Sequence, residues 1–536
     1  MLKPHHLLLF LSVLLTTGLT PLQGFAQRTL APETSSPTLA RETPQTARER
    51  DVANWFEANR DRHTQIRAFI QRMPKGADLH SHLSGAVYAE SYLGWAASEN
   101  YCVDPNALIL VAPADCRPAN GHIQAHQVFQ NIPLYNALID RWSVRNLPFA
   151  GQTGHDQFFA AFDGFDALSS NTTMRPRMVA EVISRAAAQN IQYLELMLTI
   201  QGRAVRALAP ELQLSRGDEE AFALARRQLL QNPQFQALIQ QGVAELDTLQ
   251  RDLFLTLGCH HSNRPSHCNV TVNYIQQTNR LNRPEEVFAQ FVYAIELIKA
   301  HPDVVGLNLV APEDHPVALR DYSLQMAMLG FLSRQESDLN IALHAGELTL
   351  GLVPPSELRF HIREAVEVAQ AKRIGHGVSI FYEDDPWDLL ATMAQRGVLV
   401  EICLTSNDVI LNVTGPAHPF LDYLKAGVPV TLATDDEGIG RIDLSHEYWQ
   451  SAIHYGLGYV ELKRLARNSL EYSFLPGDSL WSSPEYRSLA APCQGDNPGR
   501  GTLSTGCANF LANHERANQQ WLLETQFSEF EALPWR

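Results

Sequence analysis

Histidine and acidic side chains of the kind that bind metals occur in four short segments, far apart in this chain. The segments are Asp78-Leu79-His80-Ser81-His82, His344-Ala345-Gly346-Glu347, Gly375-His376-Gly377 and Thr434-Asp435-Asp436. Imidazole and carboxylate groups without thiolates suit a borderline metal such as zinc. Because side chains alternate along a strand, the two histidines of an HxH pair on a strand point to the same side. The segments therefore predict one metal site, if the fold brings them together.

Each segment lies at or near the end of an apolar, strand-like run. Eight such runs occur, at residues 77–83, 191–198, 270–276, 304–310, 340–347, 373–380, 398–404 and 428–434. Most gaps hold amphipathic helix patterns, such as residues 284–300 and 355–371. Strands that alternate with helices pair in parallel, and eight such units predict an α/β fold, a (β/α)8 barrel of the TIM type. Active sites of that fold lie at the C-terminal ends of the strands, where strands one, five, six and eight carry the four segments.

In this combination the segments resemble the adenosine deaminase family of metal-dependent hydrolases. The secreted branch, the adenosine deaminase-related growth factors and their exported bacterial relatives, is the most similar. Further stretches agree with the family: Met73-Pro74-Lys75, Thr405-Ser406-Asn407 and Asp443-Leu444-Ser445-His446-Glu447-Tyr448. The resemblance covers roughly residues 73 to 476. It implies a metallohydrolase that acts on a C–N bond of a cyclic amidine.

The resemblance also implies the metal ligands. His80, His82, His344 and Asp435 match the family's ligands for one zinc ion per subunit. One coordination position stays open for water, as a catalytic zinc site requires. The reaction implied is the hydrolytic deamination of adenosine, and of 2′-deoxyadenosine, to the inosine product and ammonia.

Three more residues match the family's catalytic positions. Glu347 corresponds to the residue that protonates a ring nitrogen of the purine. His376 corresponds to the residue that stabilises charge near the attacking water, and Asp436 to the residue that orients the base. We therefore expect Glu347, His376 and Asp436 to be catalytic.

We expect the substrate to contact Asp436, Ser84, Gly85, Phe158, Phe162 and Ala311. Phe158 and Phe162 lie in a stretch that resembles the aromatic helix lining the family's pocket. Two positions depart from the best-known adenosine deaminases. Ser84 stands where those enzymes have an acidic residue that meets the ribose, and Ala311 where a glycine lets the backbone approach the purine. The substrate is therefore left open among adenosine, 2′-deoxyadenosine and another 6-aminopurine nucleoside.

Two other functions fit parts of this pattern. Another amino-heterocycle deaminase or amidohydrolase on the same barrel would share the metal ligands without using Glu347 and Asp436 in these roles. A non-catalytic nucleoside-binding or growth-factor-like protein needs no acid/base residues, and the intact set argues against it. Product analysis separates the first alternative from a purine nucleoside deaminase.

The N-terminus has the layout of a secretory signal peptide. Lys3 precedes an apolar run at residues 7–15, and Gly24-Phe25-Ala26 suits cleavage, which predicts a signal peptide over residues 1–26. The run is shorter than the roughly 20 residues of a spanning helix, so we expect no membrane span after cleavage. We expect an exported protein, periplasmic or secreted. Residues 27–50, rich in Ser, Thr, Pro and Ala, predict a flexible leader before a single domain over residues 51–536.

Six of the seven cysteines form pairs that are close in sequence: Cys102 with Cys116, Cys259 with Cys268, and Cys493 with Cys507. In an exported protein these pairs predict disulfides, and Cys403 is left over. The first two pairs lie in long insertions near residues 90–171 and 201–269, which predict lids, a homodimer surface, or both. The third lies in a Gly-, Ser- and Pro-containing tail from about residue 477, predicted to be loop-rich. A formal net charge of −16 argues against nucleic acid as a partner. The resemblance implies a small-molecule purine nucleoside as the ligand.

Overall fold

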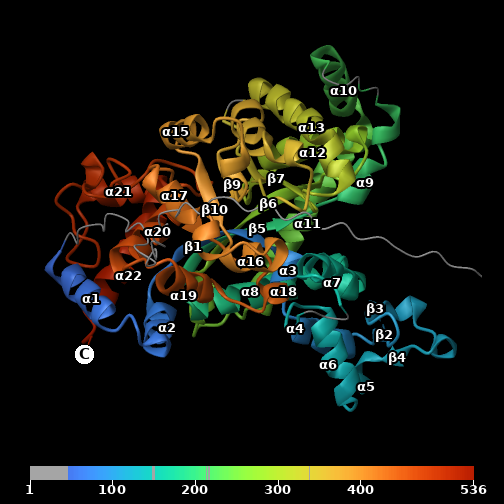
Figure 1. Cartoon of the computed structure of the whole chain (residues 1–536), viewed down its shortest axis with the longest axis horizontal. Coiled ribbons are helices and arrows are strands. Elements are labelled where there is room, and N and C mark those ends of the chain that lie inside the picture. Colours follow the sequence, from blue (N-terminus) through green and yellow to red (C-terminus); the bar gives the residue numbers. More distant parts are fainter. Residues whose placement is uncertain (1–45, 148–150, 213, 215–217, 337, 536) are drawn as a thin grey trace, which may run out of the picture. The chain divides into compact units, whose positions relative to one another are not determined.

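Figure 1 shows the computed structural model, which describes residues 46–147, 151–212, 214, 218–336 and 338–535. The predicted signal peptide and most of the predicted leader lie outside the described residues. None of the helices in the described part of the chain combines the length and the apolarity that crossing a membrane requires.

Eight parallel strands form the centre of the fold, in two sheets of four. The first sheet runs in the order β1 (Gly76–His82), β5 (Ile191–Leu198), β6 (Thr271–Asn279), β7 (Val304–Val310). The second contains β8 (Ala342–Ala345), β9 (Arg373–His376), β10 (Leu399–Ile402) and β11 (Val430–Leu432). Single parallel bridges join the sheets on both sides, between Ser81 and Asp435 and between Leu307 and Ile341. All eight predicted strands are therefore present, and the bridges close them into the predicted (β/α)8 barrel.

Helices follow the strands and surround the barrel (Figure 1). They include α8 (Arg175–Ala188), α12 (Pro284–Ala300), α13 (Pro316–Gln335), α15 (Pro386–Arg396), α16 (Leu404–Leu411), α17 (Phe420–Lys425), α18 (Glu437–Gly440), α19 (Leu444–His454) and α20 (Tyr459–Glu471). Proline at the first position of α12, α13 and α15 sets the backbone for a helix start without losing a hydrogen bond. At the N-terminal side, α1 (Ala47–Ala58) and α2 (His63–Arg72) precede the barrel.

The connection between β8 and β9 corrects one expectation. The pattern at residues 355–371 predicts one helix, but the chain forms a 3-10 turn (Pro355–Leu358), the short α14 (His361–Arg363) and a π-helical turn (Glu364–Val368). The backbone leaves the helical region at Phe360, where φ is −148° and ψ is −10°, so the 3-10 turn and α14 do not join into one helix. Apolar periodicity alone does not reveal such a break.

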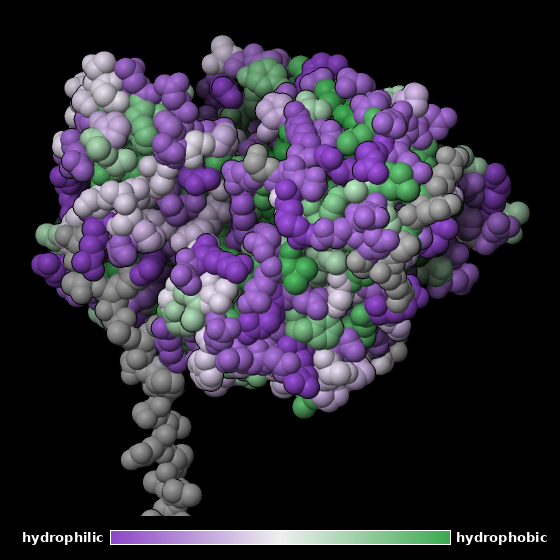
Figure 2. Space-filling model, turned by 90° about the horizontal axis from the view of Figure 1, so that it is seen from above, coloured by the Kyte–Doolittle hydropathy of each residue, from purple (hydrophilic) through white to green (hydrophobic). Residues whose placement is uncertain are grey.

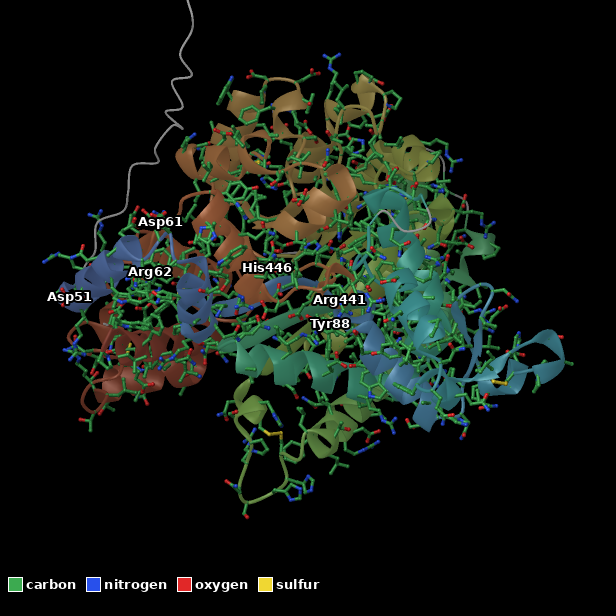
Figure 3. All side chains as sticks on the ribbon, turned by 60° about the horizontal axis from the view of Figure 1, so that its bottom comes forward. Asp51, Asp61, Arg62, Tyr88, Arg441 and His446 are labelled. Atoms are coloured by element: carbon green, nitrogen blue, oxygen red, sulfur yellow. A yellow bond between two sulfur atoms is a disulfide. The ribbon has the colours of Figure 1, made fainter. Side chains whose placement is uncertain are left out.

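The two insertions have secondary structure of their own. The first contains α3 (Leu83–Ala86), α4 (Ala89–Ser98), a small antiparallel sheet of β2 (Cys102–Asp104), β3 (Ile109–Val111) and β4 (Ile123–Gln124), then α5 (Ala125–Val128), α6 (Ile132–Arg141) and α7 (Gly154–Ser169). The second contains α9 (Gly202–Arg206), α10 (Glu219–Gln231) and α11 (Pro233–Thr256). Arg441, after α18, connects the first insertion to the barrel. It lies over the Tyr88 ring (Figure 3) and also forms an ion pair with Glu90.

The C-terminal tail is only partly loop-rich. Its second half forms α21 (Thr505–Asn513) and α22 (Glu515–Glu531), which the composition did not predict. Two buried ion pairs fix α22 to α20: Arg467 Nε lies 2.7 Å from Glu524 Oε1, and Lys463 Nζ lies 2.6 Å from Glu531 Oε1. The tail is therefore part of the packed fold.

All three predicted disulfides are present, Cys102–Cys116, Cys259–Cys268 and Cys493–Cys507, and Cys403 is free and buried. The face of the molecule in Figure 2 is mostly hydrophilic, with apolar residues scattered over it. Such scattered apolar residues are normal for a protein surface.

Candidate metal centre and active site

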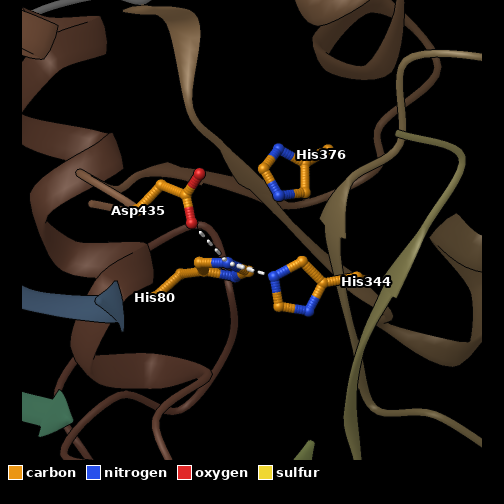
Figure 4. A group of neighbouring side chains, drawn as sticks. All are labelled: His80, His344, His376 and Asp435. Carbon is orange, nitrogen blue, oxygen red and sulfur yellow. Dashed lines mark hydrogen bonds and ion pairs between the residues drawn. The ribbon is translucent and has the colours of Figure 1, made fainter. Parts of the chain in front are cut away.

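The four predicted ligands converge at the C-terminal ends of the strands, and Figure 4 shows three of them, His80, His344 and Asp435. His80 Nε2 and His82 Nε2 each lie 3.1 Å from His344 Nε2. Asp435 Oδ1 lies 3.4 Å from His80 Nε2 and 3.3 Å from His82 Nε2. The two histidines of the HxH pair therefore reach the same point, as strand alternation predicts.

These separations suit a tetrahedral metal. Ligand atoms about 2.0–2.1 Å from a zinc ion, in tetrahedral geometry, lie about 3.3 Å from one another. The measured separations of 3.1–3.4 Å are close to that value. Three imidazole nitrogens and one carboxylate oxygen are also a donor set that zinc accepts. The residues present therefore fit a metal ion of this kind.

Every candidate ligand has a polar partner on the side away from the cluster. The pairs are His80 Nδ1 with Glu401 Oε2 (2.6 Å), His82 Nδ1 with Gln277 Nε2 (2.8 Å), His344 Nδ1 with Asn308 Oδ1 (2.9 Å) and Asp435 Oδ2 with the Ser406 hydroxyl (2.7 Å). Partners of this type fix the orientation of metal ligands and tune their basicity. At His82, a ligand role for Nε2 requires the carboxamide oxygen of Gln277, in place of its Nε2, to face Nδ1. The cluster is therefore held in position by the protein itself.

Local backbone geometry makes room for the cluster. A Cβ at Gly375 would lie 2.5 Å from His80 Cε1, so only glycine leaves space for this ring. Asp435, His376 and Ala311 all have positive φ, of 60°, 69° and 88°. Such conformations cost non-glycine residues free energy and persist where the surroundings impose them, often at functional sites.

Glu347 lies beside the cluster on a fixed backbone. The buried Glu313 carboxylate accepts hydrogen bonds from the amides of Gly346 (3.0 Å) and Glu347 (2.8 Å). Glu347 Oε1 is buried, lies 3.6 Å from His376 Nδ1 and has no hydrogen-bond partner among the described residues. Burial, Asp435 and Glu313 raise the pKa of Glu347 well above its ordinary value. Glu347 is therefore suited to carry a proton that it can donate.

Asp436 resembles Glu347 in its surroundings. Its Oδ1 is also buried without a hydrogen-bond partner among the described residues. Burial and the adjacent Asp435 carboxylate raise the pKa of Asp436 well above its ordinary value. A Cβ at Gly85 would lie only 1.6 Å from Asp436 Oδ1, so Gly85 makes room for this side chain.

A chain of hydrogen bonds sets the tautomer of His376. The Phe420 amide donates to His418 Nδ1 (3.1 Å), so neutral His418 carries its proton on Nε2. His418 Nε2 then donates to Asn407 Oδ1 (3.0 Å), and Asn407 Nδ2 donates to His376 Nδ1 (2.9 Å). Burial lowers the pKa of His376 to about 4, so the ring is neutral and its proton is on Nε2.

That Nε2 is buried and has no hydrogen-bond partner among the described residues. The His376 ring lies next to the cluster, with its centroid 5.1 Å from that of His80 and 5.3 Å from that of His344 (Figure 4). Its Nε2–H can therefore donate to an oxygen held beside the cluster.

A cavity of about 420 Å³ opens onto these groups. Its lining includes the predicted residues His82, Ser84, Phe158, Phe162, Ala311, His344, Glu347, Asp435 and Asp436. The Phe158 and Phe162 rings come from α7, which begins at the N-cap Thr153. Gly85 does not line the cavity but lies behind Asp436. The volume is within the range of small-molecule sites.

Sequence reasoning missed several residues that orient this site, namely Glu313, Glu401, Asn308, Gln277 and His418. Glu401, Asn308 and Gln277 are polar residues inside or at the end of apolar strands, which was the available signal. A polar side chain that is buried in a barrel strand needs a partner. The sequence does not show which one.

The comparisons with known proteins identify the family of this chain. The sequence profile described as "Adenosine deaminase" matches residues 143–480. "Adenosine deaminase 2" of Dictyostelium discoideum is 32% identical over 198 residues, 36% of this chain and 35% of the relative. "Adenine deaminase" of Rhizobium rhizogenes is 31% identical over 194 residues, 36% of this chain and 54% of the relative. The matches thus span about a third and about a half of these relatives.

Among solved structures, the N6-methyl-AMP deaminase from Arabidopsis thaliana is similar. It is 21% identical, with a TM-score of 0.49, over 76% of this chain and 94% of that one.

Proposed function

Because the chain belongs to the adenosine deaminase family, we propose that it is a zinc-dependent hydrolase that converts adenosine and 2′-deoxyadenosine to their inosine products and ammonia. One observation carries the proposal. A cluster of three histidines and one aspartate has the separations of a tetrahedral site. It shares a cavity with two buried carboxyl groups, each of which has an oxygen without a hydrogen-bond partner among the described residues. Deamination needs these parts: a site for water activation, a proton donor and a group that orients the base.

The residues of this chain divide the work of the reaction. His80, His82, His344 and Asp435 would hold the metal, which lowers the pKa of a coordinated water when bound. Glu347 donates its proton to a ring nitrogen of the purine, which makes the neighbouring carbon more electrophilic. Asp436, which lines the same cavity, shares a hydrogen bond with a second ring nitrogen. His376 donates from Nε2 to the oxygen that attacks, as negative charge develops there.

The aromatic wall formed by Phe158, Phe159 and Phe162 excludes water from the base. His155, at the start of α7, lies 3.2 Å from Asp314 in the loop after β7. This contact joins the aromatic helix to the loop that contains Ala311. α7 is therefore in a position to act as a lid over the bound purine.

A second candidate substrate is a free 6-aminopurine base. One relative is named adenine deaminase. Ser84 and Ala311 also differ from the acidic residue and the glycine that an adenosine site is expected to have at these two positions. Ser84 removes a carboxylate that would meet a ribose, and the Ala311 methyl group narrows the approach to the ring. The same catalytic residues would serve both substrates.

We further propose that the protein is exported, to a periplasm or outside the cell. The three disulfides support this location, since structural disulfides persist in oxidising compartments. The insertions would then form the surface for a homodimer or a lid.

The deciding experiment is ultraviolet absorbance of the purified, zinc-loaded protein with adenosine, 2′-deoxyadenosine and adenine in turn. We expect the adenine spectrum of the nucleosides to shift to that of hypoxanthine, and Glu347→Ala to abolish the shift. A shift with adenine alone would replace the first substrate by the second. No shift with any of the three, in protein shown to contain metal, would contradict the proposal.

Removing a ligand should remove metal and activity together. We expect Asp435→Ala to lose bound zinc, measured by atomic emission, and to lose turnover in proportion. Asp436→Asn is the matched control, because Asp436 is adjacent but outside the ligand set, and should keep its zinc. An active Asp435→Ala protein without metal would contradict the assigned ligands.

A further inference from the structure

A second, larger cavity adjoins the candidate active site. It has a volume of about 760 Å³ and shares Ser84, Gln277, Asn279 and Val310 with the inner cavity of about 420 Å³. All four shared residues are uncharged. A ligand whose base lies in the inner cavity can therefore extend past Ser84 into the outer one without meeting a charge at the junction.

The charged residues of the outer cavity differ from those of the inner one. Arg175, Arg203 and Arg206 line it, together with the acidic residues Asp166 and Glu245. Glu245 is already engaged, because it pairs with the Arg175 guanidinium and accepts a hydrogen bond from Gln201 at 2.8 Å. The outer cavity therefore retains a net basic character despite the acidity of the whole chain, whose formal charge is −16.

Two of the arginines are free to bind a ligand. Within the described part of the chain, Arg203 and Arg206 have no ion pair or side-chain hydrogen bond. Both lie on α9, one turn apart, where side chains three positions apart lie on the same face. α9 follows β5, so it stands at the same C-terminal end of the barrel as the metal cluster (Figure 1).

The two adjoining cavities thus present side chains of opposite charge. The inner cavity presents Glu347, Asp435 and Asp436 to a base that accepts protons and hydrogen bonds. The outer cavity presents guanidinium groups, which match phosphate oxygens in charge and in their paired donor geometry. A neutral nucleoside would use only the first of these features.

We propose that the outer cavity binds the phosphate of a 6-aminopurine nucleotide, through Arg203 and Arg206, with Arg175 beside them. The substrate class is then phosphorylated nucleosides, with the unphosphorylated nucleoside as the poorer substrate. This inference rests on the proposed deaminase function for its chemistry, but the phosphate site itself can be tested by binding alone. Ser84 fits this role, since a carboxylate at the junction would repel an anion that passes it.

The test compares adenosine 5′-monophosphate with adenosine on the zinc-loaded enzyme. We expect a higher kcat/KM for the monophosphate. We expect Arg203→Ala combined with Arg206→Ala to lower it about tenfold or more, through KM, because charge-assisted contacts to a phosphate are lost. Turnover of adenosine should stay within about twofold, since neither arginine lines the inner cavity. Arg206→Lys should recover part of the affinity, and added salt should weaken monophosphate binding more than adenosine binding.

Arg227→Ala is the matched control, because Arg227 is an exposed arginine on α10 that lines neither cavity. An arginine double variant that weakens both substrates equally would overturn the inference, as would deamination of adenosine without any of the monophosphate. If neither compound is deaminated, the proposed function fails, and calorimetry with inosine 5′-monophosphate against inosine decides the phosphate site independently. Tighter binding of the monophosphate that depends on Arg203 and Arg206 supports the site; equal binding of the two contradicts it.

Discussion

Two layers of buried charged groups lie one above the other in the barrel, and they differ in whether their charges are paired. In the lower layer, Arg373 pairs with Glu195 (2.6 Å) and with Glu401 (2.7 Å). In the upper layer, Glu347 and Asp436 each keep a buried oxygen without a hydrogen-bond partner among the described residues. The lower layer comes from β5, β9 and β10, and the upper layer from the segments that follow β8 and β11.

The paired charges of the lower layer serve stability, whereas the unpaired groups of the upper layer serve function. A buried charge with a partner is tolerated, and removing the partner is strongly destabilising. A buried polar atom without a partner costs free energy, so its presence in a folded protein requires an explanation such as a ligand. His80 touches both layers, because its Nδ1 contacts Glu401 and its Nε2 lies in the metal cluster. The lower layer therefore supports the upper one.

The largest effect should come from the upper layer and be confined to catalysis. We expect Glu347→Gln to lower kcat about 10²- to 10⁴-fold, the usual contribution of a positioned acid or base. We expect no loss of stability, because burial and nearby carboxylates already disfavour the ionised form of Glu347, which has a raised pKa. Steady-state kinetics and urea denaturation measure both quantities, with zinc content as a control. A Glu347→Gln enzyme of near-normal rate would end the assignment of Glu347 as proton donor.

The reverse result is expected in the lower layer. Arg373→Met should cost about 3–5 kcal/mol of stability, since it leaves two buried carboxylates without their partner. Its matched control is Arg251→Met, on the surface of α11, where Arg251 pairs with the exposed Asp252. That control should change stability by less than about 1 kcal/mol. Urea midpoints that are equal for the two variants would show that the lower layer does not stabilise the fold.

The sequence predicts the upper layer far better than the lower one. The ligand residues occur in short motifs at strand ends. The (β/α)8 pattern predicts that the C-terminal ends of the strands lie together at one end of the barrel. Glu195, Arg373 and Glu401 stand in three separate strand-like runs, more than 20 residues apart, and form no local motif with one another. Their pairing depends on strand register, as when Gly375 of β9 aligns with Glu401 of β10. Register is a property of the closed barrel and is not visible in any one strand.

The same limit applies to the rest of the site. Phe158 and Phe162 are predicted as pocket residues from a resemblance, and the structure places both in the cavity wall. Glu313, which holds the Glu347 backbone, has no motif, because its role depends on a loop that crosses from one strand end to the next. The helical tail is missed for a similar reason: α22 is stabilised by buried pairs with α20, not by its own composition.

A change at the contact between the layers should have an intermediate effect. We expect Glu401→Gln to weaken zinc binding about 10- to 100-fold, because a carboxylate behind a histidine ligand raises the basicity of that ligand. Competition with a chelator of known affinity measures it. Gln276→Ala, a buried change in β6 of a residue that hydrogen-bonds to Ile200, serves as a control and should leave zinc affinity unchanged. Equal zinc affinity in Glu401→Gln and the native protein would mean that the two layers are independent.

The smallest effect should come from the rim of the cavity, the contact between His155 and Asp314. This pair is partly exposed, unlike the buried groups of the two layers. His155 lies 3.2 Å from Asp314 and 3.1 Å from Asp156, and the side chains of His155 and Asp314 are 20% and 18% exposed. The hydrogen bond to Asp314 is the main reason why the pKa of His155 lies above its ordinary 6.5. Partial burial opposes this increase, and the negative charges of Asp314 and Asp156 add to it. A histidine with a raised pKa gives its full stabilisation to the contact below about pH 6.5, where the imidazole is protonated. This stabilisation is lost as the pH rises through the raised pKa.

Closure of α7 over the cavity should therefore weaken at alkaline pH, and KM should rise. An ion pair of this exposure contributes at most about 1 kcal/mol, so the rise is no more than about fivefold. His155→Gln should raise KM at pH 6 to the level of pH 8.5 and remove most of the difference between the two pH values. Asp156→Asn is the control, because its carboxylate faces solvent more than Asp314 does and should have the smaller effect. If His155→Gln leaves the pH profile of KM unchanged, the rim pair does not hold the lid, and only the buried layers determine how the site works.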